Sequence, residues 1–266
     1  MADSVLYEVN DGLATITLNR PDAMNALNID AKIALREAVQ GAAEDPRVRA
    51  VLLTATGRAF SVGQDLKEHI ALLAEDRAAG GGSTMSTVRE HYNPIVRALA
   101  GMAKPVVAGV NGVAAGAGLG FALAADYRVV AETATLTTAF AGVALSADSG
   151  ISWTLPRLIG RARATDLLLF PRSLSAQAAY EMGLADKVVP ADRLADEARA
   201  VARALAEGPT LAYAAIKESL AFGAGHSLEE TLVKEEELQA RAGASEDHAT
   251  AVQSFIAKEK PVYRGR

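Results

Sequence analysis

The sequence predicts an α/β fold, and three observations predict it. Short β-rich runs alternate with amphipathic segments along most of the chain. The apolar run Pro105–Val110 leads directly into the glycine- and alanine-rich segment Gly112–Gly120. From about Pro209 onward the pattern is almost wholly helical and rich in Glu, Lys and Ala. Since strands that alternate with helices are typical of sheets covered by helices, we expect a core over residues 1–208 and a helical region over residues 209–266.

Periodicity and turn residues predict the individual elements. The runs Leu6–Val9 and Leu13–Leu18 are β-rich, and Asn10-Asp11-Gly12 between them is a hairpin signal. Apolar residues at helical spacing predict helices over 29–43 and 88–102. Further strands are expected over 48–54, 106–110, 127–131 and 187–189. The segment Leu72–Ser86 has little periodicity and contains three successive glycines, so we expect a mobile loop there.

Composition excludes several classes of function. Of the 266 residues 50% are hydrophobic, none is cysteine and the net charge is −5. Disulfides, thiolate metal sites and cysteine nucleophiles are therefore excluded, and the four scattered histidines show no metal-ligand spacing. No basic stripe indicates a nucleic-acid partner, and no apolar run is long enough for a membrane span. The first residues lack the pattern of a secretory signal, so we expect a cytoplasmic protein.

The segment Gly112–Gly120 is the strongest functional signal. The segment has few large side chains, so a ligand can approach its main chain closely. The first amides of the helix that follows have no hydrogen-bond partner within the helix. Such a turn binds a phosphate or an oxyanion, or it packs a helix tightly on a strand. The glycine spacing differs from a dinucleotide fingerprint, and no Walker Gly-Lys-Ser/Thr triplet exists. A second small-residue loop, Gly57–Lys67, also follows a strand, and two such loops can present two amides to one oxygen.

These loops carry a family resemblance. The motifs Ala59–Leu66 and Val110–Gly120, supported by Asn19–Leu27 and Pro156–Gly160, resemble those of the crotonase (enoyl-CoA hydratase/isomerase) superfamily along essentially the whole chain. The resemblance implies a spiral of ββα units with a C-terminal helical trimerisation region. It also implies a homotrimer or a dimer of trimers and an acyl-CoA thioester substrate. No separate cofactor is implied, because coenzyme A is part of the substrate.

Site residues follow from the same resemblance. The main-chain amides of Ser61 and Ala117 would form the oxyanion hole for the thioester carbonyl. Substrate-binding positions would be Met24, Ala26, Leu27, Ala59, Asp65, Leu66, Gly116 and Phe140. Phe255 and Lys258 match residues that cover bound coenzyme A, sometimes in a neighbouring subunit, and Lys67 is a second candidate for its phosphates. Taken without the family, Asp65 is a loop cap.

The carboxylates point to the reaction. Family hydratases use two glutamates, which would fall at Gly120 and Phe140 of this chain, and both positions lack a carboxylate. Asp148 instead matches the single aspartate of family isomerases, especially the ring-1,2-epoxyphenylacetyl-CoA isomerase subgroup and some Δ3,Δ2-enoyl-CoA isomerases. The resemblance therefore implies an acyl-CoA isomerase that shifts a C=C double bond through an enolate, with Asp148 as base and then acid.

The surroundings of Asp148 set its pKa. Apolar neighbours would raise the pKa, whereas a helix N-terminus would lower it. The apolar neighbours expected from the sequence are Phe140, Val143, Leu145 and Trp153. As an alternative to catalysis, Asp148 would cap a helix that begins near Ser149.

Three other functions stay open at this stage. They are an enoyl-CoA hydratase, an aryl-CoA dehalogenase with Asp148 as nucleophile, and a non-catalytic acyl-CoA-binding protein. A dehalogenase would also need an upstream histidine. His91 does not match that position, and we expect it to be a solvated helix residue.

Overall fold

Two sheets form the centre of the molecule. The computed structural model describes residues 3–266. The larger sheet has the strand order β1-β2-β3-β5-β7-β10, and the smaller has the order β4-β6-β8-β9. The strands of the larger sheet are β1 (Val5–Asn10), β2 (Leu13–Leu18), β3 (Ala50–Ala55), β5 (Val106–Val110), β7 (Tyr127–Ala131) and β10 (Lys187–Val189). Those of the smaller sheet are β4 (Ala59–Ser61), β6 (Val113–Ala115), β8 (Thr135–Thr137) and β9 (Leu174–Ser175).

The chain winds between the two sheets as a spiral. Strands β3, β5 and β7 of the larger sheet lie parallel to one another, and each is followed by a strand of the smaller sheet, β4, β6 and β8. A helical segment then returns the chain to the larger sheet. This repetition is the predicted spiral of ββα units, so the α/β fold is confirmed.

The local sequence explains the elements that were predicted. The hairpin forms at Asp11 and Gly12, which have positive φ angles of 50° and 80°, the backbone that a tight hairpin turn needs. Strand β5 is buried at every position, as expected of a parallel strand covered on both faces. Asn28 caps helix α1 (Ile29–Glu44) by accepting the Ala31 amide at 3.1 Å.

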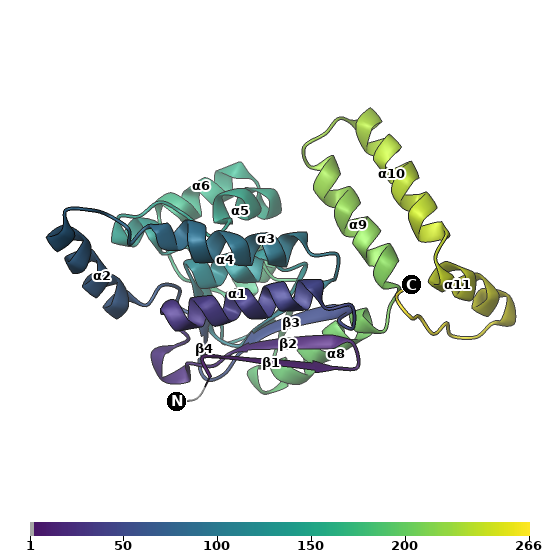
Figure 1. Ribbon diagram of the computed structural model, residues 1–266, viewed down its shortest axis with the longest axis horizontal. Coiled ribbons are helices and arrows are strands. Elements are labelled where there is room, and N and C mark those ends of the chain that lie inside the picture. Colours follow the sequence, from purple (N-terminus) through teal and green to yellow (C-terminus); the bar gives the residue numbers. More distant parts are fainter. Residues whose placement is uncertain (1–2) are drawn as a thin grey trace.

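Helices cover both faces of the larger sheet (Figure 1). Helix α1 packs on β1 and β2 and against α3 (Asn93–Gly101), while α8 (Leu194–Ala206) packs on β3, β5 and β7. Helix α4 (Ala117–Ala124) is buried at all of its positions between the neighbouring layers. The other helices of this part are α5 (Ile151–Ile159), α6 (Arg161–Leu169) and α7 (Ala176–Met182).

The segment that was expected to be a mobile loop is largely helical. Helix α2 (Leu66–Ala79) covers its first half, and the predicted loop begins only at Gly80, which ends the helix with φ 67°. The periodicity is weak because α2 buries none of its residues, so no apolar stripe marks it. The predicted helix over 88–102 is confirmed, but it begins as a π-helical turn, η2 (Val88–Tyr92), before α3. In Figure 1, α2 projects from the left end of the molecule.

The C-terminal part is helical, as predicted. Helices α9 (Thr210–Gly223), α10 (Leu228–Gly243) and α11 (Glu246–Ala257) stand at the opposite end of the molecule from α2 (Figure 1). Arg49, next to β3, links this part to the spiral by donating to Gly208 O at 2.6 Å and Tyr263 O at 3.1 Å.

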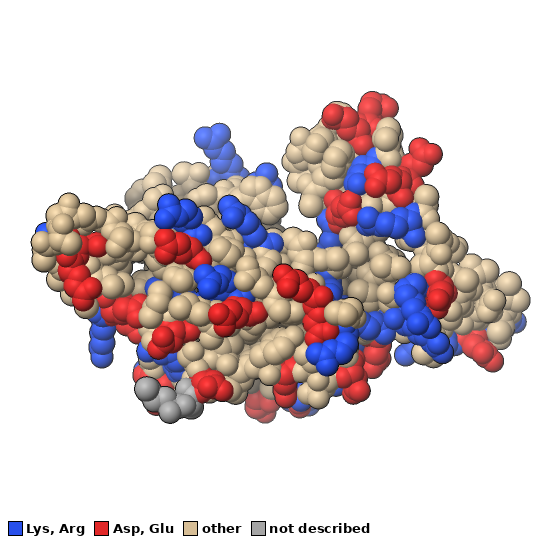
Figure 2. Space-filling view, viewed as in Figure 1, with Lys and Arg blue, Asp and Glu red and all other residues tan. Residues whose placement is uncertain are grey.

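The surface carries mixed charges. Figure 2 shows acidic and basic side chains interspersed over the face in view. Within residues 3–266, no helix is long and apolar enough to cross a membrane.

Candidate active site

The two glycine-containing loops meet at the start of α4. A Cβ atom added to Gly118 would lie 2.4 Å from the carbonyl oxygen of Ser61, so only glycine allows this approach. A Cβ on Gly63 would lie 3.3 Å from the amide nitrogen of Ala117. The end of β4 and the first turn of α4 are therefore in direct main-chain contact.

The first turn of α4 has free main-chain donors. Gly116 precedes the helix with φ 52° and ψ −123°, a conformation that glycine adopts easily and other residues do not, and no side chain caps the helix. The first amides of an α-helix have no partner within the helix, so the Ala117 amide is available to a ligand oxygen.

A third segment lies beside these loops. Leu27 forms a bridge with Gln64, and its amide donates to Gly63 O at 2.8 Å. Asn25 holds the segment in place by donating to Thr56 O and Ala59 O. Of the positions expected to bind substrate, Ala26, Leu27 and Ala59 are buried and Met24 is half-buried.

A cavity of about 140 Å³ opens where the loops meet. Val62, Gly63, Gly116 and Ala117 contribute the loop side of its wall. The remaining lining residues are Gln64, Leu66, His69, Met85, Thr87, Val88, Tyr92, Ala139, Phe140, Val143, Leu145 and Asp148. The expected positions Leu66, Gly116, Ala117, Phe140 and Asp148 are thus brought together around one space.

Ser61 does not line this cavity. It is fully buried, and its hydroxyl donates to Asn25 O at 2.8 Å and accepts the Gly63 amide. The next residue, Val62, lines the cavity instead. The Val62 amide makes one long contact, 3.3 Å, with Met24 O.

Asp148 faces the cavity in a largely apolar setting. Burial raises the pKa of its carboxyl group, and the hydrogen bond from the Ser149 hydroxyl at 2.8 Å partly offsets that rise. Across the cavity, burial and the negative charge of Asp148 raise the pKa of Tyr92, so its phenol stays neutral. A buried carboxyl group with a raised pKa suits proton transfer near neutral pH.

The loop that carries Asp148 is strained. Ala139, Ala144 and Ser149 have φ angles of 62°, 57° and 50°. Such left-handed conformations are costly for residues other than glycine, and they cluster at functional sites. On the far side, a Cβ on Gly120 would lie 2.6 Å from the Cβ and carbonyl oxygen of Ser149. The absence of a side chain at Gly120 therefore lets this loop pack on α4.

The sequence and the fold are similar to those of known proteins. The family model for enoyl-CoA hydratase/isomerase matches residues 8–266. The chain belongs to this family, the crotonase superfamily. A probable enoyl-CoA hydratase of Rhodobacter capsulatus is 40% identical over 99% of this chain and 98% of its own length. The 1,2-epoxyphenylacetyl-CoA isomerase of Escherichia coli is 38% identical over the full length of both chains.

A solved structure supports the same assignment. The crystal structure of a putative enoyl-CoA hydratase/isomerase from Mycobacterium abscessus has a TM-score of 0.95 and 47% identity, and it covers 98% of this chain and 100% of its own. Hydratase and isomerase names both occur among the relatives. The family alone therefore does not choose between the two reactions.

The expectation that Trp153 is an apolar neighbour of Asp148 is wrong, and the alternative of Asp148 as a helix cap is not found. Trp153 does not face the cavity: it is 51% exposed and packs beneath the guanidinium of Arg157, 4.1 Å from its ring centroid. Asp148 is not a helix cap, because α5 begins at Ile151 after Gly150 and no side chain caps it. Asp148 contributes only its main-chain carbonyl, which accepts the Ile151 amide.

His91 was expected to be solvated and is buried, with 7% exposure. The cause is the π-helical turn over Val88–Tyr92, which adds a residue to the turn and shifts the faces of the helix.

The remaining expected binding residues lie outside the cavity. Asp65 caps α2 by accepting the Lys67 and Glu68 amides, and it accepts Nη1 of Arg20 at 3.1 Å. Its capping function is therefore confirmed by the structure. Phe255, 85% exposed, and Lys258 lie at the end of α11, on the opposite side of the molecule from α2 (Figure 1).

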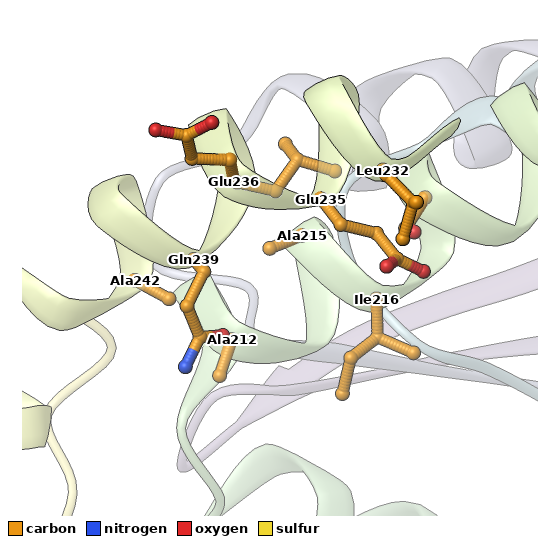
Figure 3. Close-up of a pocket in the computed structure, with 10 residues that line it drawn as sticks. Ala212, Ala215, Ile216, Leu232, Glu235, Glu236, Gln239 and Ala242 are labelled. Atoms are coloured by element: carbon orange, nitrogen blue, oxygen red, sulfur yellow. The ribbon is translucent and has the colours of Figure 1, made fainter. Parts of the chain in front are cut away.

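A larger groove lies away from this site, between α9 and α10. Figure 3 shows Ala212, Ala215 and Ile216 of α9 facing Leu232, Glu235 and Gln239 of α10. Within residues 3–266, no group of three or more His, Cys, Asp or Glu side chains is placed to hold a metal ion.

The raised pKa of Asp148 predicts a pH-dependent stability. Because burial favours the neutral acid, the folded protein holds this proton more tightly than the unfolded chain. The stabilising effect is complete below the ordinary carboxyl pKa and is lost as the pH rises through the raised value. We expect Asp148→Asn to be more stable than wild type at about pH 8, with the difference shrinking toward about pH 3.5.

Urea unfolding of both proteins at these two pH values measures the effect. The exposed Asp192→Asn variant is the matched control, and it should show no such pH-dependent gain. A gain for Asp148→Asn that is equal at both pH values would contradict the prediction.

Proposed function

We propose that this protein is an acyl-CoA isomerase that moves a C=C double bond with Asp148 as the proton carrier. One observation carries the proposal: among residues 3–266, Asp148 is the single carboxylate that lines the cavity beside the two glycine loops. Hydration with two glutamates needs a pair of carboxylates around one water molecule. A double-bond shift needs only one group that first removes and then returns a proton.

The positions of the hydratase glutamates support an isomerase over a hydratase. Gly120 packs so closely on Ser149 that a side chain there would displace the loop of Asp148. Phe140 fills the second position with an apolar ring that is 8% exposed and lines the cavity. Both substitutions exclude polar side chains and make the surroundings of Asp148 more apolar.

The proposed steps use the residues around the cavity. The thioester carbonyl accepts hydrogen bonds from the amides of Ala117 and Ser61, the two donors that the family resemblance implies, and these donors stabilise the negative oxygen of the enolate. Asp148, ionised at the start, removes a proton from the α-carbon of a 3-enoyl thioester, and the electrons move onto the carbonyl oxygen. When they return, the γ-carbon takes the proton back from Asp148, giving the 2-enoyl product.

The volume of the cavity limits the size of the acyl group that it can hold. A cavity of about 150 Å³ in another protein binds benzene, and this one measures about 140 Å³. We therefore propose a compact acyl group of about the size of one ring. The Escherichia coli relative is named for a ring-bearing acyl-CoA. Residues Met24–Leu27, beside the loop at Gly63, would line the path of coenzyme A, and Phe255 and Lys258 would reach it only from a neighbouring copy.

The first test compares two reactions of the purified protein. We expect conversion of a 3-enoyl-CoA to the 2-enoyl-CoA, followed by ultraviolet absorbance of the conjugated thioester. Asp148→Asn should lower kcat about 10²–10⁴-fold, the usual contribution of a positioned acid/base, whereas Asp192→Asn should leave it unchanged. Rapid hydration of crotonyl-CoA that survives Asp148→Asn would contradict the proposal.

The second test removes one amide donor. Ala117 is the first residue of α4, where proline is tolerated, and Gly116 has no Cβ to clash with the ring. We expect Ala117→Pro to lower kcat about 10²–10³-fold, as loss of one oxyanion donor does. Ala117→Gly keeps the N–H group and is the control. Equal kcat values for the two variants, both correctly folded by circular dichroism, would rule out this donor.

We also propose that α9–α11 form an interface between copies of the chain. Large apolar side chains on these helices are exposed, including Ile216, Leu220, Leu228, Val233 and Ile256. Exposed apolar patches of this kind mark interaction surfaces, and the groove in Figure 3 extends the same surface.

Light scattering after size exclusion tests the interface. We expect a mass three or six times that of the 27.7 kDa chain. Leu220→Glu should lower the mass, because it places a charge at a position that is 71% exposed in the single chain. A monomeric wild-type protein at micromolar concentration would contradict the proposal.

A further inference from the structure

A buried lysine lies behind the wall of the acyl cavity. The side chain of Lys32 on α1 is 1% exposed. Its ammonium nitrogen contacts Thr87 Oγ1 at 3.0 Å, Gln64 Oε1 at 3.3 Å and Glu68 Oε1 at 3.5 Å. The ammonium group therefore donates two hydrogen bonds, to Thr87 and Gln64, and the carboxylate of Glu68 balances its charge as an ion-pair partner, as a buried charge requires. Thr87 and Gln64 also line the cavity that Asp148 faces.

We propose that the Thr87 hydroxyl, polarised and oriented by Lys32, is a specificity-determining donor for acyl groups that carry an oxygen atom. Thr87 touches the acyl group and Lys32 is a positioning residue that acts through it. The inference rests on the proposed function, since it concerns the acyl group bound in the same cavity.

The direction of the hydrogen bonds assigns Thr87 as a donor. An ammonium group can only donate, so Thr87 Oγ1 accepts from Lys32 and keeps its own hydrogen. Among residues 3–266, no acceptor receives that hydrogen. Because Thr87 lines the cavity, a ligand oxygen there can accept it. A hydroxyl that already accepts from a cation is a stronger donor.

Neighbouring groups on the same wall are also polar. The Tyr92 hydroxyl donates to Gln64 Oε1, which also accepts from Lys32. Tyr92 is 2% exposed, and the ammonium of Lys32 lies 5.9 Å from its ring centroid. The Nδ1 atom of His69, which also lines the cavity, is buried without a hydrogen-bond partner. These side chains form one polar wall, consisting of Gln64, His69, Thr87 and Tyr92.

This wall discriminates against a pure hydrocarbon. The rest of the cavity has apolar side chains, including Met85, Val88, Phe140, Val143 and Leu145. A hydrocarbon would displace water from the Thr87 hydroxyl and give no hydrogen bond in return, which costs free energy because the hydroxyl then has no acceptor. An acyl group of the same shape with an ether, hydroxyl or carbonyl oxygen restores the bond. The geometry favours a compact, oxygen-bearing acyl group over an alkyl chain.

Three thioesters of the same shape test the inference. Cyclohexylacetyl-CoA carries a hydrocarbon ring, and oxan-3-yl- and oxan-4-ylacetyl-CoA carry one ring oxygen at alternative positions. Isothermal titration gives the Kd of each, and deuterium uptake at the α-carbon in D₂O gives the rate of enolate formation. We expect wild type to bind one oxane thioester about ten-fold more tightly than the cyclohexyl compound, as one hydrogen bond allows.

The variants separate Thr87 from the general shape of the cavity. Thr87→Val keeps the shape and removes the hydroxyl, so the Kd ratio should fall to about one. Thr87→Ser keeps the hydroxyl and should retain the preference. Lys32→Met should reduce the preference without contacting the ligand, and Thr135→Val on β8, outside the cavity, should retain it.

Each outcome decides between the possibilities. Equal Kd values of the three thioesters in wild type, or a preference that Thr87→Val keeps, would overturn the inference even if all three exchange their α-protons. If the protein catalyses neither α-proton exchange nor double-bond isomerisation, the proposed function is wrong. The Kd ratio would still test whether Thr87 selects oxygen-bearing acyl groups. Should Lys32→Met fail to fold, the pair Thr87→Val and Thr87→Ser carries the test alone.

Discussion

The close contact between Gly118 and Ser61 is the constraint on which the rest of the site depends. With a Cβ at position 118 only 2.4 Å from the Ser61 carbonyl oxygen, α4 could not begin where it does. The first turn of α4 would then move away from Val62 and Gly63, and no single oxygen could reach main-chain donors from both loops. Each loop lies at the end of a strand of the smaller sheet, so the spiral brings the loops together before any side chain contributes.

The absence of a side chain at a second glycine of α4 positions Asp148. Gly120, two residues farther along α4, packs on Ser149 and so fixes the loop that carries Asp148. This loop contains left-handed residues, and its close contact with α4 at Gly120 helps to hold it in place. The surroundings of the carboxyl group are then apolar, and its raised pKa follows from burial. Glycine at position 120, where family hydratases have a glutamate, thus removes a carboxylate from α4. It also leaves room for the loop that brings in the carboxylate of Asp148.

The sequence predicted the repeating part of this structure better than the walls of the cavity. Strands β5, β7 and β10 were placed correctly because buried apolar runs are strong signals. The Ser61 side chain lies outside the cavity and Val62 lines it, while the Ser61 amide as an oxyanion donor stays a prediction, because a motif identifies a loop but not which of its groups faces the ligand. Trp153 was assigned to the cavity because it follows Asp148 in the sequence, whereas α5 turns it toward solvent.

The polar wall had no readable signal in the sequence. Lys32 lies among the amphipathic positions of α1, and Thr87 falls between the weakly periodic segment 72–86 and the predicted helix over 88–102. Their significance arises only because Gln64, Glu68 and Thr87 converge on one buried ammonium group from separate parts of the chain. Long-range contacts of this kind are set by tertiary packing, which local pattern does not encode.

The residues of the polar wall and the catalytic acid come from different segments of the chain, so substrate specificity can vary without a change in the reaction. Gln64, His69, Thr87 and Tyr92 all belong to the segment between β4 and β5, whereas Asp148 comes from the loop after β8. Helix α2, within the first segment, has no fully buried residue, so substitutions there cost little stability, apart from those of Glu68, which pairs with Lys32. Lys32 is different, since removing it would leave the buried side of Glu68 without its cation. A polar acyl cavity is therefore maintained by the core helix α1, while its detailed shape is free to vary in the segment that lines it.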